Sequence, residues 1–292
     1  KIKGIAHFIE HLVFTGTKTR THEDISREIE KKGGILNAFT SHDMTSFLFK
    51  LPSEHCFAGL DILTDILNNP VFEKEKFEKE KKVIIEEIKM YHDMPMRHVH
   101  EKIEENLFEK PFGDGVIGSI ETISKLPRDF VFEYYKKNYN PKNYIVSIVG
   151  GVDPKKIAKY LEKNFKPSKQ KTEMQKIKTR HRETVEERLG IDQSHFMIGF
   201  QAPNAKSEEN TALEVLNAYL AEGMSSRLFL EIRENRGLAY TVKGYLNGEK
   251  SHSYYSIYVG TTKEAISEVK KIVLKEIKNL QNLKEKDIAE AK

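Results

Sequence analysis

The chain has 292 residues, of which 38% are hydrophobic, 32% charged and 10% aromatic, so a disordered or low-complexity protein is excluded. Its 48 Lys and Arg against 44 Asp and Glu leave a net charge of only +4, which argues against a nucleic-acid partner. No apolar run reaches the roughly 18 residues of a membrane span, and the single Cys56 excludes an internal disulfide or a cysteine-based zinc site. We expect a soluble protein without a membrane span, and the cytoplasm is the favoured compartment.

The hydrophobic pattern of the first half alternates between helical and strand periods. It predicts strands at 34–40, 44–51 and 143–150, where β-forming residues concentrate. It predicts helices over seven further ranges, which are 4–15, 22–32, 53–68, 73–92, 96–108, 127–138 and 153–165.

The second half repeats this outline after a polar stretch. Residues 166–186 are rich in Lys, Thr and Glu without an apolar stripe, so we interpret them as a linker between domains at 1–165 and 187–292. EIEKKGG at 28–34 aligns with EIRENRG at 231–237 at an offset of 203 residues, which favours an internal duplication. The strands predicted beyond the linker are 193–201, 238–246 and 252–260, and the helices are 208–222, 225–235, 262–280 and a last one from 284. The fold class expected is α+β, with two similar domains, each a mainly antiparallel sheet with helices packed on one face.

The segment GIAHFIEHLVF at 4–14 is apolar on almost every side of a helix, so we expect it to be buried. Its ionisable side chains, His7, Glu10 and His11, project from one narrow face of that helix. Burying them without partners costs several kcal/mol. Two His residues one turn apart can bind one Zn²⁺ and leave Glu10 beside it as a base for water. A buried, hydrogen-bonded His pair without metal is the alternative.

A catalytic zinc site needs a third protein ligand, and the helix predicted at 73–92 offers one. With Glu80 taken as zero angle, Ile84 lies at about 40° and Glu87 at about 340°, so both carboxylates share the apolar face. Glu86 lies about 120° away, towards solvent. We predict Glu87 as the ligand and Glu80 as a second carboxylate that orients a ligand or water. Salt bridges from both carboxylates to nearby Lys residues are the alternative.

Three further His residues form a possible cluster in the segment YHDMPMRHVH. They are His92, His98 and His100, but the break at 93–95 places them on different elements. We interpret this segment as a solvated turn and not as a metal site.

Together these residues resemble the inverted-motif zinc peptidases of the pitrilysin and insulinase family, most closely its bacterial branch similar to the mitochondrial processing peptidase. The family's HxxEH motif supplies two ligands and the base, and it matches HFIEH at 7–11. The third family ligand is a Glu about 76 residues after the second His, which is Glu87 here, and a further family carboxylate matches Glu80. The segments GGILNAFTSHDMTSF, FGDGVIGSIETISKL and YNPKNYIVSIVGGVD extend the resemblance over nearly the whole chain.

The resemblance implies roles for five other residues. The strand with Asn37, Ala38 and Phe39 would pair with the substrate backbone and capture a peptide through main-chain hydrogen bonds. The segment SSRLFLEIRENRGLAY looks like the one whose Arg and Tyr face the scissile carbonyl, so Arg233 and Tyr240 would bind the oxyanion. An Arg salt bridge and a half-buried strand Tyr are the alternative. Because family members are usually longer at both ends, we expect the first strand of domain one and the last helices of domain two to be absent.

These expectations describe a zinc metalloendopeptidase with Zn²⁺ as its cofactor, which cleaves peptides or unfolded, presequence-like segments in an enclosed chamber. Glu10 would assist the attack of a water molecule activated by zinc. A non-catalytic assembly or peptide-binding subunit of the same fold is one alternative, and a zinc-dependent hydrolase of non-peptide amides is another. A closed chamber in the family's two-chain members needs four such domains, so a homodimer with composite active sites is expected.

Overall fold

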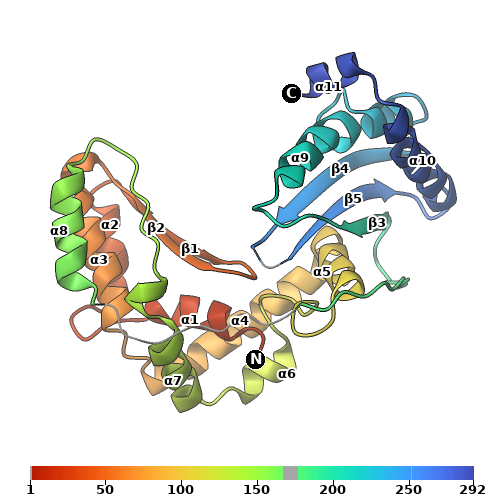
Figure 1. Cartoon of the computed structure of the whole chain (residues 1–292). Helices are drawn as coiled ribbons and strands as arrows, with labels where there is room; N and C mark the ends of the chain where they lie inside the picture. The colour runs from red at the N-terminus through yellow and green to blue at the C-terminus, as the bar shows by residue number, and fades with distance from the viewer. Residues whose placement is uncertain (1, 167–176, 251) are drawn as a thin grey trace. The chain divides into compact units, whose positions relative to one another are not determined.

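Figure 1 shows the computed structural model of the chain, which describes residues 2–166, 177–250 and 252–292. The chain divides into two compact units, one formed by Lys1–Met90 with Gly115–Lys176 and the other by Tyr91–Asp114 with Ile177–Lys292. Each unit combines helices with a small antiparallel sheet, so the predicted α+β class is confirmed. The units differ from the predicted domains in one respect, because the segment 91–114 packs with the second unit.

The first unit builds its sheet from two strands, β1 (Ile35–Thr40) and β2 (Thr45–Lys50), which pair so that Thr40 lies opposite Thr45. Because Ile35 and Phe39 on one face of this hairpin are 61% and 46% exposed, the helices of the unit pack on its other face. They are α1 (Ile5–Val13), α2 (His22–Glu30), α3 (Cys56–Asn68), α4 (Lys74–Asp93), α6 (Ile120–Lys125), α7 (Arg128–Asn138) and α8 (Pro154–Asn164), with short 3₁₀ turns η1 (Ser53–His55) and η2 (Pro141–Asn143).

Helix α1 begins at a glycine that the surroundings require. Gly4 has a φ of 85°, and a Cβ at this position would lie 2.6 Å from the carbonyl oxygen of Ile117. A residue with a side chain would therefore be strained here and would push the start of α1 away from the segment before α6. Gly4 thus fixes where the helix with the HFIEH motif enters the unit.

The core of the first unit lies where α1 meets α4. Phe8 and Phe77 are fully buried, and their ring centroids lie 4.8 Å apart. Ile84, two helical turns after Phe77 on α4, is also buried. This packing holds the two helices side by side over the length that carries the predicted metal ligands. Burial of large apolar side chains of this kind contributes about 1.5–3 kcal/mol each.

Two local predictions in the first unit were wrong. Residues 144–149 do not form the expected strand, and Ile145 and Val149 are 85% and 97% exposed. A strand needs a partner for its backbone groups, and within the described residues none pairs with this segment, although its composition is rich in β-formers. In contrast, α6 was not predicted; Ser119 and Thr122 cap its first turn reciprocally.

The second unit contains a three-stranded antiparallel sheet in the order β3-β5-β4, in which β5 is central. The strands are β3 (Ser194–Gln201), β4 (Ala239–Gly248) and β5 (Ser253–Thr261). The helices are α5 (Pro95–Leu107), α9 (Glu208–Ala221), the π-helical turn η3 (Phe229–Glu234), α10 (Ile266–Asn279), the 3₁₀ turn η4 (Leu280–Asn282) and α11 (Glu285–Ala291).

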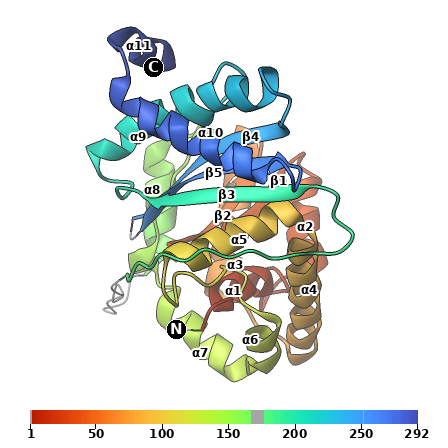
Figure 2. The same ribbon diagram turned by 90° about the vertical axis from the view of Figure 1, so that its right-hand side faces the viewer.

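Helices cover both faces of this sheet (Figures 1 and 2). The face with Ile257 and Val259 packs with α9 and α10, and the opposite face, with Met197 and Tyr254, packs with α5. Gly199 lets helix α5 approach β3 closely, since a Cβ at this position would lie 2.6 Å from the side chain of Ile103. Ile103, Leu107 and Tyr254 form one buried cluster, which joins α5 to the second unit.

The break expected at 93–95 is present, because α4 ends at Asp93 and α5 begins at Pro95, and the side chain of His92 is 60% exposed. The expected solvation was wrong for His98 and His100. His98 lies on α5 with its side chain 15% exposed, and its Nε2 is 2.7 Å from Glu186. The ring of His100 lies 4.7 Å from that of Tyr245 in an edge-to-face arrangement. Pro95 occupies the first position of α5, as a proline in the first helical turn can, so the helix predicted from 96 begins one residue earlier.

The predicted linker lies partly outside the described residues, which resume at Ile177. Its described part is extended and packs along α5, where Arg180 N–H donates to the Leu107 carbonyl over 2.9 Å. Glu186 then contacts His98. Residues 177–186 are therefore attached to the second unit.

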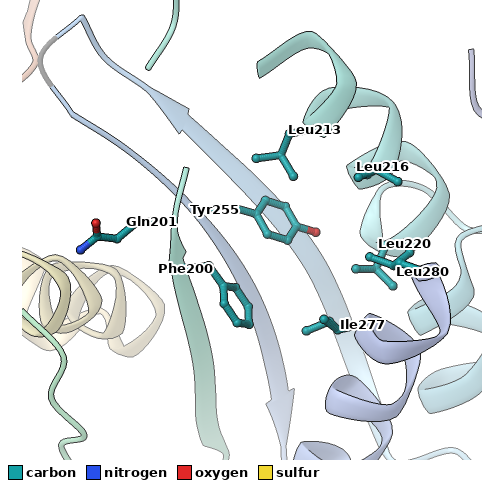
Figure 3. A pocket seen from close by; sticks show the side chains of 8 residues that line it. All are labelled: Phe200, Gln201, Leu213, Leu216, Leu220, Tyr255, Ile277 and Leu280. Carbon is teal, nitrogen blue, oxygen red and sulfur yellow. The ribbon is translucent and has the colours of Figure 1, made fainter. Parts of the chain in front are cut away.

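A small apolar pocket lies between the sheet and helices of the second unit (Figure 3). Its volume is about 170 Å³, and the ring of Tyr255 points into it. The hydroxyl of Tyr255 donates to Asn217 over 3.0 Å, so the polar tip of this residue is satisfied within the core. The lining consists of Phe200, Gln201, Leu213, Leu216, Leu220, Tyr255, Ile277 and Leu280.

Among the described helices, none is long and apolar enough to cross a bilayer.

Candidate metal centre

Helix α1 presents the ionisable residues of HFIEH beside one another although most of the helix is buried. The rings of His7 and His11 lie with their centroids 4.8 Å apart, as residues one turn apart do. Glu10 is only 8% exposed, while its neighbours Ile9 and Leu12 are fully buried in the core. The apolar residues of α1 therefore hold the helix in the core, whereas its two imidazoles and one carboxylate are not needed for that packing and can bind a metal or a proton.

The carboxylate of Glu87 on α4 lies between the two imidazoles. Its Oε2 atom is 3.7 Å from Nε2 of His7 and 3.5 Å from Nε2 of His11. This oxygen is buried and makes no hydrogen bond within the described part of the chain. Such a buried carboxylate oxygen is costly unless a cation neutralises it.

These separations suit a metal ion. Bond lengths of 2.0–2.2 Å and tetrahedral angles place zinc ligand atoms roughly 3.3–3.6 Å apart, close to the 3.5 and 3.7 Å found here. Among the residues that the structure describes, His7, His11 and Glu87 are a set of His and carboxylate side chains close enough to hold a metal, with ligand atoms within 4.8 Å of one another. The donor set, two imidazoles and a carboxylate, is that of zinc hydrolases. The residues present therefore fit a zinc ion.

Glu80 lies on the other side of His11. Its Oε2 is 3.4 Å from Nδ1 of His11, so the imidazole N–H can donate to it, and this bond turns the lone pair of Nε2 towards Glu87. Glu86 instead points to solvent with its side chain 70% exposed and accepts a hydrogen bond from Lys89 over 2.7 Å. The two faces of α4 thus separate the carboxylates as the helical angles predict.

The two central residues of the cluster have shifted pKa values. Burial raises the pKa of Glu10 above its usual range, although the hydrogen bond from Thr40 opposes this effect. Burial alone would lower the pKa of His11, but the hydrogen bond to Glu80 and the charge of Glu87 outweigh it, so the pKa of His11 is raised. The negative charges of these carboxylates stabilise a positive charge at this place. That charge can be the proton of an imidazolium or, when the imidazoles are neutral, a bound metal cation.

A groove of about 440 Å³ opens beside Glu10 and His11. Residues of α1, α2, β1 and α4 line it, so it runs from the metal ligands along the strand predicted to bind substrate. Its lining residues are Glu10, His11, Phe14, Thr15, His22, Ser26, Ile29, Glu30, Gly34, Ile35, Leu36, Asn37, Ala38 and Glu80.

The three residues predicted to bind substrate all lie on β1. Ala38 pairs with Phe47 of β2, and Asn37 Oδ1 accepts a hydrogen bond from the Ala38 N–H over 2.8 Å. Phe39 is 46% exposed. In the part of the chain that the structure describes, β1 has a strand neighbour on one edge alone.

Arg233 and Tyr240 come together within the second unit. The guanidinium of Arg233 lies 4.5 Å from the centroid of the Tyr240 ring, and its Nη1 donates to the Tyr240 carbonyl over 3.2 Å. The Tyr240 side chain is on the surface, with the residue 73% exposed. The Arg233 side chain is 32% exposed, and its Nε also lies 3.7 Å from Oε1 of Glu234, with the guanidinium 4.8 Å from the centroid of the Phe229 ring. The salt bridge considered as the alternative is therefore present beside the contact with Tyr240.

Sequence reasoning missed a contact of the predicted base. The hydroxyl of Thr40, at the end of β1, donates a hydrogen bond to Oε2 of Glu10. The strand period could have indicated it, because Leu36, Ala38 and Thr40 share the less exposed face of β1. A Thr on the inner face of the strand that follows HFIEH is therefore the sequence feature that could have predicted a hydrogen bond to Glu10.

Two family profiles cover almost the whole chain. The profile described as Insulinase (Peptidase family M16) matches residues 1–119, and the profile described as Peptidase M16 inactive domain matches residues 125–292. The chain belongs to the M16 peptidase family. This membership confirms the resemblance found in the sequence, and it covers both halves.

Relatives in the M16 family carry names that refer to zinc. A Rickettsia bellii protein named "Uncharacterized zinc protease" is 33% identical over 99% of this chain and 71% of its own length. The Bacillus subtilis protein named "Uncharacterized zinc protease YmxG" is 32% identical over 96% of this chain and 69% of its own length. The chain thus spans about seven tenths of these two relatives.

Solved structures share the M16 fold over the whole chain. A protease from Helicobacter pylori has a TM-score of 0.88 at 22% identity and covers 99% of this chain and 73% of its own. A Pseudomonas fluorescens structure titled as a peptidase M16 inactive domain also has a TM-score of 0.88, at 17% identity, covering 100% of this chain and 73% of its own. At these identities the likeness concerns the fold.

Proposed function

We propose that this chain is a zinc metalloendopeptidase that cleaves peptides or unfolded, presequence-like segments. The observation that carries the proposal is the position of Glu87 Oε2, buried between the Nε2 atoms of His7 and His11 at 3.7 and 3.5 Å. Glu10 of the same HFIEH segment adds a second buried carboxylate, which is not needed as a metal ligand. A structural His pair alone would not need these two carboxylates.

His7, His11 and Glu87 would hold the zinc ion, which supplies Lewis-acid activation of the attacking water and of the scissile carbonyl. Glu10 takes the proton from the attacking water and passes it to the nitrogen of the leaving amine. Glu80 keeps His11 oriented through the contact to Nδ1.

The substrate would bind as an added strand along the unpaired edge of β1. Main-chain groups of Asn37, Ala38 and Phe39 would pair with the peptide backbone, which makes little demand on sequence. The groove of about 440 Å³ between α1, α2 and β1 offers room for substrate side chains next to Glu10. This arrangement favours extended peptides over folded proteins.

Cleavage of an internally quenched peptide tests the proposal. The zinc-loaded protein should cleave it, a chelator should abolish cleavage, and added Zn²⁺ should restore it. Glu10→Gln should keep its zinc and lose about three orders of magnitude in kcat, because a general base contributes 10²–10⁴-fold. A variant with more than a tenth of wild-type activity would remove Glu10 from this role, and an inactive wild-type protein with bound zinc would favour a peptide-binding subunit.

We propose further that two copies of the chain pair and that Arg233 and Tyr240 of one copy complete the site of the other. The exposed Tyr240 and the guanidinium beside its ring support this, because a guanidinium and a phenol that a substrate can reach can bind a developing oxyanion.

A subunit-mixing experiment tests the composite site. Equal amounts of Glu10→Gln and Tyr240→Phe chains, each inactive alone, should recover about a quarter of wild-type activity, since half the dimers are mixed and each has one intact site. A mixture that stays inactive after proven subunit exchange would contradict the proposal.

A further inference from the structure

We propose that Thr40 is a positioning residue for Glu10 and that its hydroxyl holds the carboxylate in the orientation needed for proton transfer. This inference rests on the proposed peptidase function, because it assigns a role to a neighbour of the base. The motif HFIEH places Glu10 on α1, whereas Thr40 comes from the end of β1, 30 residues further along the chain. The contact is therefore made by the packing of strand on helix.

The hydrogen-bond partners of Thr40 fix the direction of each bond. Thr40 has one hydroxyl hydrogen, and the Glu10 carboxylate can accept but not donate, so this hydrogen is directed to Glu10 Oε2. Thr45 Oγ1 lies 3.3 Å from Thr40 Oγ1, opposite it in the β1–β2 ladder. Because Thr40 has already used its hydrogen, Thr45 must be the donor in that pair.

A third hydroxyl extends the series. Tyr139 at the end of α7 lies with its hydroxyl 3.4 Å from Thr45 Oγ1 and also 3.4 Å from the carbonyl oxygen of Ala6. When Tyr139 donates to Thr45, the three hydroxyls form a chain in which every donor points towards Glu10. Such chains strengthen the last bond through mutual polarisation.

The chain of hydroxyls distinguishes the two oxygens of Glu10. Oε2 accepts the hydrogen bond from Thr40, which lowers the basicity of that oxygen, so we assign the proton transfer to Oε1. The same bond restricts rotation about the terminal torsion of the Glu side chain, which is otherwise broad. Thr40 thus holds one oxygen in place and leaves the other as the base.

A matched pair of variants tests the role. Thr40→Val keeps the shape of the side chain without its hydroxyl, and Thr40→Ser keeps the hydroxyl. We expect Thr40→Val to lower kcat by about 10- to 100-fold with KM unchanged, because loss of orientation costs factors of this size. Thr40→Ser should stay within about threefold of wild type. Equal activity in all three proteins, or equal losses in both variants, would overturn the proposal.

Combination with the base variant separates positioning from a general effect on the fold. In a Glu10→Gln background, Thr40→Val should cause no further loss of the residual activity, because the group that it positions is already gone. A second loss of full size would show that Thr40 acts elsewhere. This comparison also serves if Thr40→Val is less stable, since activity is expressed per folded, zinc-loaded chain.

Two readouts do not depend on activity. The zinc affinity of Thr40→Val should equal that of wild type, and a fall in affinity parallel to kcat would mean that Thr40 acts through the ligand helix. A crystal structure of Thr40→Val should show the Glu10 carboxylate in more than one orientation, and Thr40→Ser in one. A single unchanged orientation in Thr40→Val would overturn the inference even if the wild-type protein cleaved no peptide, whereas inactivity of the wild type alone would fall on the proposed function.

Discussion

Adding 203 to the numbers of His7, Glu10 and His11 in α1 leads to Asn210, Leu213 and Glu214 in α9 of the second unit. The same offset carries the start of β1 to position 238, next to the start of β4. The two helices thus hold equivalent places in the two halves of the chain, each followed by a helical segment and then by strands. Their side chains differ in chemistry.

The difference is visible in the cavities beside the two helices. Glu10 and His11 line a groove of about 440 Å³ with several polar side chains. Leu213 lines an apolar pocket of about 170 Å³ (Figure 3). A helix at the equivalent place therefore does not suffice for a metal site, because α9 carries Asn210, Leu213 and Glu214 where α1 carries His7, Glu10 and His11. We expect the zinc chemistry to be confined to the first unit.

The largest effect is expected at the third ligand. Glu87→Gln should weaken zinc binding by more than about 100-fold, since loss of a ligand exceeds the 10–100-fold cost of losing its neighbour. Glu86→Gln, on the solvent face of the same helix, should bind zinc as wild type does. Competition with a chromogenic chelator measures both constants. Similar losses in the two variants would show that α4 responds to any loss of charge.

A smaller effect is expected at Glu80, which contacts His11 Nδ1 over 3.4 Å. Glu80→Gln should weaken zinc binding by about 10–100-fold, because the imidazole loses the carboxylate that orients it and raises its basicity. The same chelator competition gives the value. An affinity equal to wild type would mean that Glu80 only forms a surface contact.

The smallest effect concerns the stability of the first unit. Asp65 is buried and accepts hydrogen bonds from Thr17, Thr19, Arg20 and Asn69. Burial alone would raise the pKa of Asp65, but these donors lower it below its usual range. Asp65→Asn should therefore lower the free energy of unfolding by about 1–3 kcal/mol at neutral pH.

The pH dependence of that difference has a definite sign. A carboxyl group with a lowered pKa in the folded state stabilises the protein above its unfolded pKa of about 3.9, and this contribution is lost as pH falls through the lower, folded pKa. Urea unfolding should show wild type and Asp65→Asn converging below about pH 4. A difference that stays constant down to the acid transition would contradict this account.

Sequence alone predicted the elements whose side chains repeat regularly. The period of α1 and α4 placed His7, Glu80 and Glu87 on inner faces, because helical angles are the same in every protein. The repeat at 28–34 and 231–237 likewise indicated two similar units. These features depend on local geometry.

Features that depend on distant partners were not predicted. The segment 143–150 has a strand composition but no pairing strand within the described residues, and α5 packs on β3 of the second unit through Gly199. The bond from Thr40 to Glu10 joins two elements across the first unit. Composition and period carry no information on such contacts, because they arise when the chain is packed.

The most direct test of the central claim is the zinc content of three purified proteins, measured by plasma mass spectrometry against protein concentration. Wild type should contain one zinc per chain. His11→Ala should contain almost none, whereas Glu214→Ala, at the equivalent place in α9, should still contain one. Equal zinc in wild type and His11→Ala, or loss of zinc in Glu214→Ala, would contradict a metal site confined to the first unit.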